Sequence, residues 1–426
     1  MKKPSVCILG VGFVGLTLAA ALSKAGMLVY GLDIDAKLVS NLNNGVTTIK
    51  EPGLEKILLK GLSNKTLKFY NSIDDLSLLQ ECEYFILTVG TPLKDGIVNN
   101  ELIENALNSI LDLISENATI ILRSTTKVGT ANQVQEQIMK HKKSFHIAMC
   151  PERTVEGNAL DELQTLPQII GADDEKSFQK ARFLFESLGV ECVRVSSLRA
   201  AELTKLINNT YRDLMFGYSN EIALLASSLG ISAIEVINAA NYKYARSNIA
   251  LPGPSGGPCL EKDPWILAES GKSVGVNMLI TSSARRVNEE LPVKFLLENV
   301  NLLKSYKKIA LLGLSFKGVP EVLDSRGSVS KLLVRFLVEK FPNTSIVGYE
   351  PAGLFVNDFS EIEQCESLDK ALVDTDLLII TTKSQSFYSI ETLISSKSDS
   401  TCLILDFWNL LQSTELGKKQ IYRALG

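Results

Sequence analysis

The chain contains 426 residues, which is long enough for two or three domains. Hydrophobic residues make up 45% and charged residues 22%, a composition typical of globular proteins. Its net charge of −4 excludes the basic surface of a nucleic-acid-binding protein, and without a run of roughly 18 apolar residues no membrane span is expected. The seven cysteines form no CxxC pair, so we expect no zinc or other metal site, and the absence of a secretory segment favours the cytoplasm. His141 and His146 lie among lysines, which predicts a solvated surface and argues against histidine acid–base chemistry.

Short apolar runs alternate with helical patterns in the first part of the chain. Residues 5–10 indicate a strand, 12–24 an Ala- and Leu-rich helix and 27–33 a second strand, which together make a βαβ unit. Helical patterns separate most of the further buried strands, which are expected at residues 84–89, 119–124, 147–149 and 168–171. We therefore predict a doubly wound parallel sheet that ends near residue 198.

The middle and the end of the chain differ in their periodicity. From residue 200 to about 241 the pattern is helical, with 201–229 as one long helix or two abutting ones, and a second helical pattern covers 264–291. A helix is expected over 328–340, and strand signals return at 307–313, 345–349, 377–381 and 402–407. The predicted class is α/β, with two Rossmann-like, doubly wound parallel-sheet domains joined by a central all-α segment, divided into residues 1–198, 199–303 and 304–426.

The first strand leads into the motif Gly10-x-Gly12-x-x-Gly15, and Asp33 ends the second strand eighteen residues later. Glycines at these positions permit a tight turn, close approach of a pyrophosphate and close helix packing, with the phosphates at the helix N-terminus. Asp33 would accept hydrogen bonds from ribose hydroxyls and repel a 2′-phosphate. The motif therefore predicts NAD, and not NADP, as the cofactor.

Polar residues recur on one face of the expected central helix. Lys205, Asn209 and Arg212 are spaced i, i+4 and i+7, and apolar side chains occupy the opposite face. Lys205 can stabilise an oxyanion and Asn209 can donate a second hydrogen bond, whereas the alternative is a solvated polar face.

Two loops at strand ends carry further polar groups. The loop at residues 150–157 holds Glu152 and Glu156, one of which can act as a base toward water; the alternative is a turn with surface acids. Thr125 follows another strand and can hold a water molecule or a cofactor group.

Residues 253–265 form a loop rich in glycine and proline around Cys259, which precedes Asp263 by four residues. Glycine allows backbone and ligand to approach closely, and proline stiffens the loop. A cysteine is more often a small buried hydrophobic residue, which we expect for the other six. This loop instead presents a thiol to a ligand, and a thiol beside a hydride acceptor indicates oxidation of an aldehyde through a thioester.

Taken together, these motifs resemble the UDP-glucose/UDP-N-acetylmannosamine dehydrogenase family over almost the whole chain. The most specific ones are Glu202-Leu-x-Lys205-x-x-x-Asn209 and the Cys259 loop. Shorter motifs stand in the same order, namely Glu51-Pro-Gly-Leu54, Gly90-Thr-Pro92, Ser124-Thr125, Pro151-Glu152 and Gly313-Leu-Ser-Phe-Lys-Gly318.

The resemblance implies an N-terminal NAD domain, a central helical segment that forms a homodimer and a C-terminal UDP-sugar-binding domain. It implies four-electron oxidation of the C6 alcohol of a UDP-sugar with two NAD, by way of a thiohemiacetal and a thioester on Cys259, to supply a surface polysaccharide. Lys205 and Asn209 would stabilise oxyanions, and Asp263 with Thr125 would order water or assist proton transfer. One of the two glutamates of the 150–157 loop would assist hydrolysis, and the sequence leaves that choice open.

By motif position, the resemblance extends to a wider set of binding residues. The cofactor contacts that it implies are Gly10, Gly12, Val14, Gly15, Asp33, Thr91, Thr125 and Arg326. The substrate contacts that it implies are Glu152, Arg153, Lys205, Asn209, Arg212, Gly256, Phe316 and Lys317, with Arg246 supplied by the neighbouring subunit.

Two motifs bear on the branch of the family, and two positions depart from its commonest pattern. Pro151-Glu152-Arg153 and Tyr211-Arg212-Asp213 resemble the UDP-N-acetylhexosamine branch, which we favour over UDP-glucose. Pro258 removes a backbone N–H directly before the cysteine, and Trp408 stands where many bacterial relatives place arginine. The alternatives are a UDP-glucose 6-dehydrogenase, a β-hydroxyacid-type dehydrogenase that needs no cysteine, and a non-catalytic nucleotide-sugar-binding module.

Overall fold

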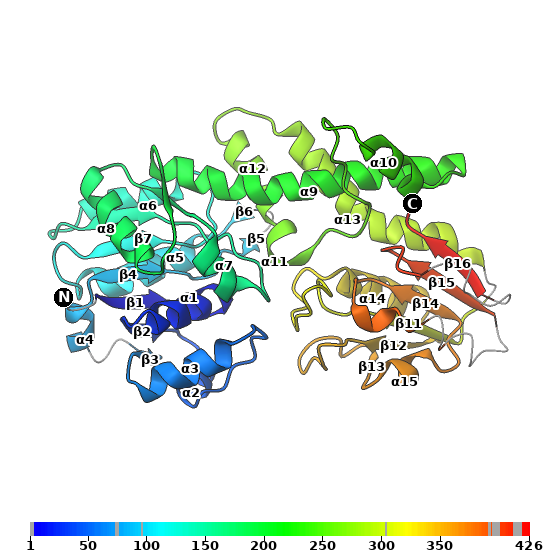
Figure 1. The fold of residues 1–426 in the computed structure, drawn as a ribbon, viewed down its shortest axis with the longest axis horizontal. Coiled ribbons are helices and arrows are strands. Elements are labelled where there is room, and N and C mark those ends of the chain that lie inside the picture. The colour runs from blue at the N-terminus through cyan, green and yellow to red at the C-terminus, as the bar shows by residue number, and fades with distance from the viewer. Residues whose placement is uncertain are drawn as a thin grey trace. The chain divides into compact units, whose positions relative to one another are not determined.

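The computed structural model describes residues 4–72, 76–94, 97–302, 305–390, 393, 401–411 and 420–426. The chain forms two compact units, Met1–Asn208 with Glu269–Val276, and Asn209–Ala268 with Asn277–Gly426. Each unit is built on its own β-sheet (Figure 1). The predicted α/β class, with two sheet domains and a helical segment between them in the sequence, is confirmed, whereas the division into three stretches of residues stays a prediction.

The first unit holds an eight-stranded sheet with the strand order β10-β9-β8-β7-β4-β1-β2-β3 among its described residues. Its strands are β1 (Ser5–Leu9), β2 (Leu28–Leu32), β3 (Leu67–Tyr70), β4 (Tyr84–Leu87), β7 (Thr119–Leu122), β8 (His146–Met149), β9 (Gln168–Gly171) and β10 (Cys192–Val195). Neighbouring strands pair in parallel along the row β8-β7-β4-β1-β2-β3. Strand β9 joins β8 antiparallel through Met149 and Gly171. A separate antiparallel pair consists of β5 (Leu93–Lys94) and β6 (Ile97–Val98).

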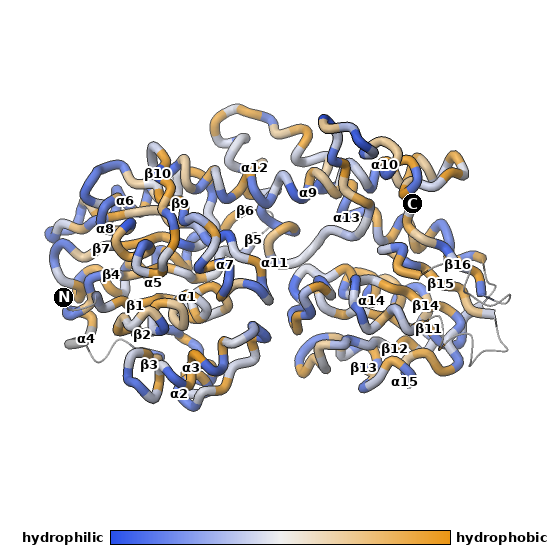
Figure 2. Tube along the Cα trace, viewed as in Figure 1, coloured by the Kyte–Doolittle hydropathy of each residue, from blue (hydrophilic) through white to orange (hydrophobic). Residues whose placement is uncertain are grey.

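The central strands of this sheet are buried on both faces. In β1, Val6 and Ile8 belong to one hydrophobic cluster while Cys7 and Leu9 belong to another, because successive side chains point to opposite faces. Figure 2 shows the resulting hydrophobic strands in each sheet. The helices of this part of the chain are α1 (Phe13–Lys24), α2 (Ala36–Asn43), α3 (Leu54–Ser63), α4 (Leu76–Glu81), α5 (Glu101–Leu111), α6 (Thr130–Met139), α7 (Ala159–Thr165) and α8 (Glu175–Glu186).

The helical middle of the chain begins with one continuous helix, α9 (Leu198–Leu229), which settles the choice between one helix and two. The single helix predicted over 264–291 is wrong, because residues 273–278 separate α12 (Asp263–Lys272) from α13 (Leu279–Asn299). Gly275 in that break has φ +80°, a conformation that ends helices. Three shorter helices complete the segment, α10 (Ala233–Asn241), α11 (Gly257–Leu260) and the 3₁₀ turn η1 (Val300–Leu302).

The second unit holds a six-stranded sheet with the order β13-β12-β11-β14-β15-β16 among its described residues. All its pairs are parallel, and the direction of winding reverses between β11 and β14. The strands are β11 (Lys308–Leu312), β12 (Ser345–Tyr349), β13 (Glu363–Cys365), β14 (Leu377–Ile380), β15 (Cys402–Asp406) and β16 (Gln420–Ala424). The helices are α14 (Val329–Lys340), α15 (Leu368–Leu372) and the 3₁₀ turn η2 (Gln385–Phe387).

The expectation that both histidines lie on the solvated surface is wrong for His146. This residue belongs to β8 and is only 9% exposed, and burial lowers the pKa of its imidazole. Its neighbours in the strand are apolar, so the preceding lysines mark the end of a loop and not the character of the strand. His141 is half-buried and lies 2.9 Å from Asp112.

Glycine at position 15 is required by packing, and its replacement tests the tight βαβ turn. A Cβ at Gly15 would overlap the carbonyl oxygen of Gly10 and lie 2.7 Å from Thr88 Oγ1, whereas a Cβ at Gly12 meets nothing within 4 Å. We expect Gly15→Ala to lower the free energy of unfolding by about 1–3 kcal/mol and Gly12→Ala to leave it nearly unchanged. Urea unfolding followed by circular dichroism measures both. Equal midpoints for the two variants would contradict this account of Gly15.

Candidate active site

The glycine turn and the acid after β2 meet in the first unit, where the motif is expected to bind the cofactor. Gly10 has φ +91°, and Val11 N donates to Asp33 Oδ2 at 2.8 Å. Gly12 is exposed and precedes α1 without a side-chain cap, so the first turn of that helix, with half-buried Val14, can receive an anionic group. Because the sheet reverses its winding between β1 and β4, this turn lies at the switch point where such folds bind ligands.

Hydroxyl groups tie three strand-end loops to one another at this edge of the first sheet. Thr88 Oγ1 donates to Gly10 O at 2.6 Å, and Thr91 Oγ1 donates to Thr125 O at 2.5 Å. Ser124 Oγ donates to Val89 O, in the loop after β4, at 2.6 Å. The structure therefore brings Thr91 and Thr125 together, and the Thr91 hydroxyl proton is used to hold the Thr125 backbone in place.

Glu202 is a positioning residue that the sequence did not reveal beyond its place in a motif. Its side chain accepts hydrogen bonds from Thr126 Oγ1 (2.9 Å), Gly129 N (2.6 Å) and Ala131 N (2.8 Å). It is 1% exposed, and burial raises the pKa of its carboxyl group against the opposing effect of these bonds. Glu202 thus fixes the first turns of α9 to the loop after β7, and Lys205 follows one helical turn later.

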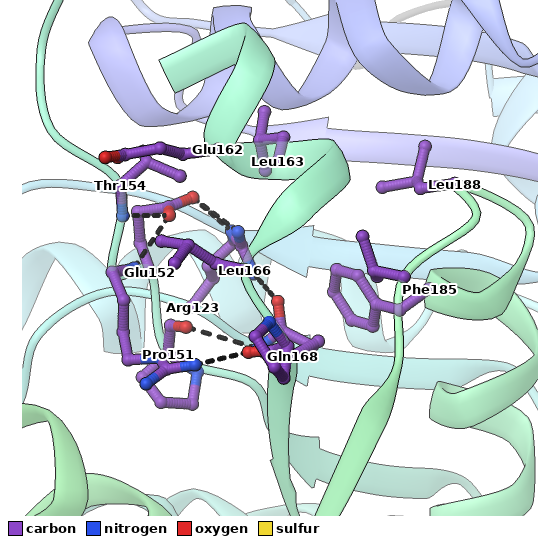
Figure 3. A pocket seen from close by; sticks show the side chains of 13 residues that line it. Arg123, Pro151, Glu152, Thr154, Glu162, Leu163, Leu166, Gln168, Phe185 and Leu188 are labelled. Atoms are coloured by element: carbon purple, nitrogen blue, oxygen red, sulfur yellow. Dashed lines mark hydrogen bonds and ion pairs between the residues drawn. The ribbon is translucent and has the colours of Figure 1, made fainter. Parts of the chain in front are cut away.

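A buried ion pair holds Glu152, the first acid of the loop after β8 (Figure 3). Arg123 donates to Glu152 Oε2 through Nε at 3.0 Å and also through Nη2. The second oxygen, Oε1, accepts the backbone N–H groups of Arg153 (2.7 Å) and Thr154 (2.8 Å). Arg123 also donates to Gln168 Oε1 at 2.8 Å, and the group lines a cavity of about 20 Å³. Both carboxylate oxygens of Glu152 are therefore engaged.

The negative charge of Glu152 is maintained despite its burial. Burial raises the pKa of this carboxyl group, but the charges of Arg123 and Lys205 and the hydrogen bonds that it accepts outweigh burial and hold the pKa below its usual range. The structure thus places Lys205, from α9, within electrostatic range of Glu152. Glu156, four residues further on, is half-buried.

The face of α9 that carries the predicted polar residues is buried, and the apolar face is exposed. Lys205 and Asn209 are 6% and 8% exposed, whereas Leu203 and Ile207 are 41% and 46% exposed. A solvated polar face is therefore excluded for Lys205 and Asn209. Arg212, which the helical spacing placed with them, is exposed and does not join them.

Asn209 and Asp263 meet in the second unit. Asn209 Nδ2 donates to Asp263 Oδ2 at 2.6 Å, and Lys262 Nζ lies 2.8 Å from Asp263 Oδ1. Asp263 is fully buried, so its two oxygens are fixed by an amide and an ammonium group. Pro258 lies in the first turn of α11, where a helix has no internal acceptor for the N–H that proline lacks.

Cys259 is the exposed member of the seven cysteines, all of which lie in the described residues. Cys192 is half-buried, and burial raises the pKa of its thiol to about 11. The other five are buried, and burial raises the pKa of Cys82 and Cys402 to about 12. Burial is consistent with packing for these five, and Cys259 alone among the seven presents an exposed thiol, whose reactivity stays a prediction.

The guanidinium group of Arg285 holds the Cys259 loop through two of its backbone carbonyls. Arg285, 2% exposed in α13, donates to Ser255 O at 3.2 Å and to Leu260 O at 3.1 Å, on either side of the cysteine. It also donates to Asp213 Oδ1 at 2.6 Å, and the same oxygen accepts Ser255 Oγ at 2.9 Å and Asn288 Nδ2 at 2.9 Å. The loop is therefore held by a buried ion pair.

The loop also contacts the segments after β11 and before α14. Gly257 N donates to Gly327 O at 2.8 Å, and a Cβ at Gly256 would overlap the same carbonyl oxygen. A Cβ at Gly257 would overlap the ring of Phe316, and the neighbouring Lys317 places Nζ 5.5 Å from the centre of that ring. Gly256, Phe316 and Lys317 thus lie together at the loop that carries the cysteine, while their contact with a substrate stays a prediction.

The remaining predicted arginines have different surroundings. Arg153 is half-buried and its Nη2 donates to a backbone carbonyl. Arg326 is exposed, and its Nε donates to both oxygens of Asp324 at 3.0 and 2.9 Å. Arg246 is exposed on the segment after α10 and lies over a tyrosine ring, 4.9 Å from its centre. Any contact of these side chains with a ligand stays a prediction.

No helix within the described residues has the length and apolar character needed to cross a membrane. The described residues likewise contain no group of three or more His, Cys, Asp or Glu side chains arranged to hold a metal ion.

Comparison with known proteins gives the same family from sequence and from structure. Residues 4–189 match the NAD-binding domain of the UDP-glucose/GDP-mannose dehydrogenase family, and residues 199–290 match its central domain. The UDP-N-acetyl-D-mannosamine dehydrogenase of Methanococcus vannielii is 32% identical, with 96% of this chain and 94% of the relative covered.

Solved structures that cover almost the whole chain include two from archaea. The structure of UDP-D-ManNAc dehydrogenase from Pyrococcus horikoshii has a TM-score of 0.84 at 28% identity and covers 99% of each chain. A UDP-glucose dehydrogenase from Pyrobaculum islandicum has a TM-score of 0.87 at 24% identity, with 99% of this chain and 98% of that chain covered, and at this identity it shows the fold alone.

Removal of the Arg285 charge tests the clamp on the Cys259 loop. Arg285→Met leaves Asp213 buried without its cation, and we expect it to lower the free energy of unfolding by about 3–5 kcal/mol. The double variant Arg285→Met/Asp213→Asn removes both charges and should recover most of that stability, yet Ser255 O and Leu260 O still lose their donor. Urea unfolding and the rate of Cys259 alkylation measure the two effects. An alkylation rate in the double variant equal to that of the wild type would contradict the clamp.

Proposed function

Because this chain belongs to the UDP-glucose/GDP-mannose dehydrogenase family, we propose that it oxidises the C6 alcohol of UDP-N-acetyl-D-mannosamine to a carboxylate. The family makes it an NAD-dependent dehydrogenase of a UDP-sugar. The particular sugar is supported by the names of the relatives that are about 30% identical and of the P. horikoshii structure. Residues 151–153, Pro-Glu-Arg, support the same branch.

The observation that carries the proposal is the setting of Cys259. Its thiol is exposed while the loop on either side is fixed by buried Arg285, and Asn209 and Asp263 form a buried pair in the same unit. A nucleophile needs access to its substrate together with groups that stabilise the charge formed on the carbonyl oxygen. A β-hydroxyacid-type dehydrogenase has no use for such a thiol.

The glycine turn, the N-terminus of α1 and Asp33 fit an NAD molecule. One NAD would accept the hydride of each of two successive oxidations, with the first NADH exchanged for a second NAD between them. In the first oxidation, the C6 alcohol loses a hydride and a proton and becomes an aldehyde. The Cys259 thiolate then adds to the aldehyde carbon, and the oxyanion takes a proton to give a thiohemiacetal. Loss of a second hydride and the hydroxyl proton leaves a thioester. Water attacks the thioester carbonyl, the C–S bond breaks, and the carboxylate and the thiolate are released.

Lys205 and Asn209 stabilise the oxygen at C6 as negative charge develops on it, through an ammonium group and an amide donor. Asp263 accepts hydrogen bonds from Asn209 and Lys262, so it orients the Asn209 amide and places a fixed negative charge there. Thr125, whose backbone is held by Thr91, has the predicted role of ordering water with Asp263.

The two glutamates differ in a way that bears on the hydrolysis step. Glu152 has both oxygens engaged and a pKa held below its usual range, which makes it a weak proton acceptor. This supports an electrostatic role for Glu152 beside Lys205. Glu156 is then the better candidate for the residue that receives a proton from the attacking water.

Further contacts are proposed on the substrate and cofactor sides. Phe316 and Lys317, together with Gly256, are proposed to contact the UDP part, since they lie together by the Cys259 loop. Arg153 and Arg212 are proposed substrate contacts. A contact of Arg326 with the cofactor and a cytoplasmic location are supported by the resemblance of the sequence alone.

A homodimer through the central helices is supported by an exposed apolar stripe on α9. Its members recur at intervals of four or seven residues, which keeps them on one face of the helix, and they are 41–63% exposed: Leu203, Ile207, Tyr211, Tyr218, Leu225 and Leu229. A stripe of this length on the outside of a chain indicates a surface that another copy covers. Arg246, exposed after α10, is proposed to reach the site of the partner copy.

The amount of NADH formed per sugar tests the reaction. With UDP-N-acetyl-D-mannosamine as the limiting substrate, we expect two NADH per sugar by absorbance, and little or none with UDP-glucose or UDP-N-acetylglucosamine. Cys259→Ala should reduce turnover by about a thousandfold or more because the thioester cannot form, whereas Cys192→Ala, a control at the half-buried cysteine, should keep it. One NADH per sugar would favour the β-hydroxyacid-type reaction. Binding of UDP-sugars without NADH would favour the non-catalytic module.

A charge in the α9 stripe tests the dimer. We expect Leu225→Glu to shift the molar mass measured by light scattering from that of a dimer toward the 46.6 kDa of one chain, since burial of a carboxylate in an apolar interface is unfavourable. Leu332→Glu, at a leucine of α14 that is also 41% exposed, should leave the mass unchanged. A Leu225→Glu protein with the mass of the wild type would exclude this face as the interface.

A further inference from the structure

Two glycines of the Cys259 loop rest against two aromatic rings of the second unit. A Cβ at Gly257 would overlap the ring of Phe316, and a Cβ at Gly253 would overlap the six-membered ring of Trp408. Gly253 is also fixed by paired hydrogen bonds with Asn220, at 2.9 and 3.0 Å. The loop therefore lies on both rings. Phe316 belongs to a motif that the sequence predicts to contact the substrate, whereas Trp408 does not.

Each of the two rings carries a lysine ammonium group. Lys317 Nζ lies 5.5 Å from the centre of the Phe316 ring, and Lys383 Nζ lies 4.8 Å from the centre of the Trp408 ring. Trp408 is itself held in place, because its Nε1 donates to Thr381 O at 2.8 Å. A cation over an indole face is attracted to the ring, and the Lys383 side chain is at the same time exposed to solvent.

The two lysines lie on neighbouring loops at the switch point of the second sheet. Lys317 follows β11 and Lys383 follows β14, the neighbouring strands between which the winding reverses. A Cβ at Gly318 would overlap the carbonyl oxygen of Lys383, so the two loops are in contact. Ligands of such sheets bind beside the carboxyl ends of the strands at this point.

The carboxylates at this edge are engaged by other groups. Glu350, after β12, accepts the backbone N–H groups of Leu314 and Ser315 at 2.8 Å each. Glu321 accepts Ser384 Oγ at 2.7 Å. Asp406, at the end of β15, accepts the backbone N–H of Trp408 at 2.9 Å and further N–H groups of the same turn.

We propose that Lys383, held over the ring of Trp408, binds the diphosphate of the nucleotide and gives this domain a second phosphate-binding cation beside Lys317. Trp408 acts as a positioning residue that sets the place of the ammonium group and supports the start of the Cys259 loop. The inference rests on the proposed function, since the diphosphate is that of the UDP-sugar. It adds a specificity element, because an exposed ammonium group over an indole favours an anionic ligand.

Binding of UDP to the full chain, measured by titration calorimetry, tests the role of Lys383. We expect Lys383→Met to raise the Kd for UDP about tenfold and to weaken its dependence on salt. Lys340→Met is the matched control, because Lys340 Nζ also lies over a ring, 5.5 Å from the centre of Phe336 at the far end of α14, and it should bind UDP as the wild type does. A Lys383→Met protein whose Kd stays within twofold of the wild type would overturn the proposal.

Binding of uridine, which has no phosphate, shows whether Lys383→Met loses only a contact with phosphate or also displaces the loop. Uridine should bind Lys383→Met and the wild type equally, and a parallel loss of uridine binding would overturn the phosphate contact. Trp408→Phe should retain most UDP affinity while Trp408→Leu should lose as much as Lys383→Met. A wild type that oxidises none of the UDP-sugars refutes the proposed function, whereas normal oxidation together with normal UDP affinity of Lys383→Met refutes this inference alone.

Discussion

The buried ion pair between Arg285 and Asp213 is the constraint on which the reactive loop depends. Removing two charges from water is costly unless each finds several partners, and here the guanidinium reaches two carbonyls while one carboxylate oxygen accepts three donors. Those carbonyls belong to Ser255 and Leu260, which bracket the cysteine. A loop fixed at both ends can expose a thiol at its centre without becoming disordered, which is the arrangement that a nucleophile requires.

The two sheets use one backbone device for two purposes. In each, an acid that follows the second strand accepts hydrogen bonds from backbone N–H groups of the loop after the first strand. Asp33 accepts the N–H of Val11 in the first sheet. Glu350 accepts the N–H groups of Leu314 and Ser315 in the second. The first sheet then continues through glycines into a helix whose N-terminus is open to phosphates. The second has no glycine triad there and presents aromatic rings with lysines above them. The same topology therefore carries a dinucleotide turn in one unit and, in the other, the lysine-topped rings that we propose to bind a diphosphate.

The features that were predictable from the sequence are those with a local cause. The turn at Gly10 and the strands around it follow from apolar runs and glycine spacing, and they fold as predicted. Arg285 was not predictable, because adjacent Arg286 has the same chemistry and is exposed, and only the fold decides which of the two meets Asp213, 72 residues away. A weak signal existed, since buried Asn288 and Pro292 follow Arg285 at i+3 and i+7 on the same face of the helix. The Arg123–Glu152 pair and the Lys383–Trp408 pair likewise join segments whose proximity no local pattern encodes.

The distribution of thiols also determines how this protein responds to oxidants. Peroxides react with thiols in the order of their exposure and ionisation, so a protein with five buried thiols, a half-buried Cys192 and an exposed Cys259 would be oxidised at Cys259 first. A sulfenic acid on that sulfur cannot add to an aldehyde, but it leaves both hydrophobic cores intact. With Cys259 as the proposed nucleophile, oxidation at this sulfur would stop turnover without unfolding the protein, and a reducing agent would restore it.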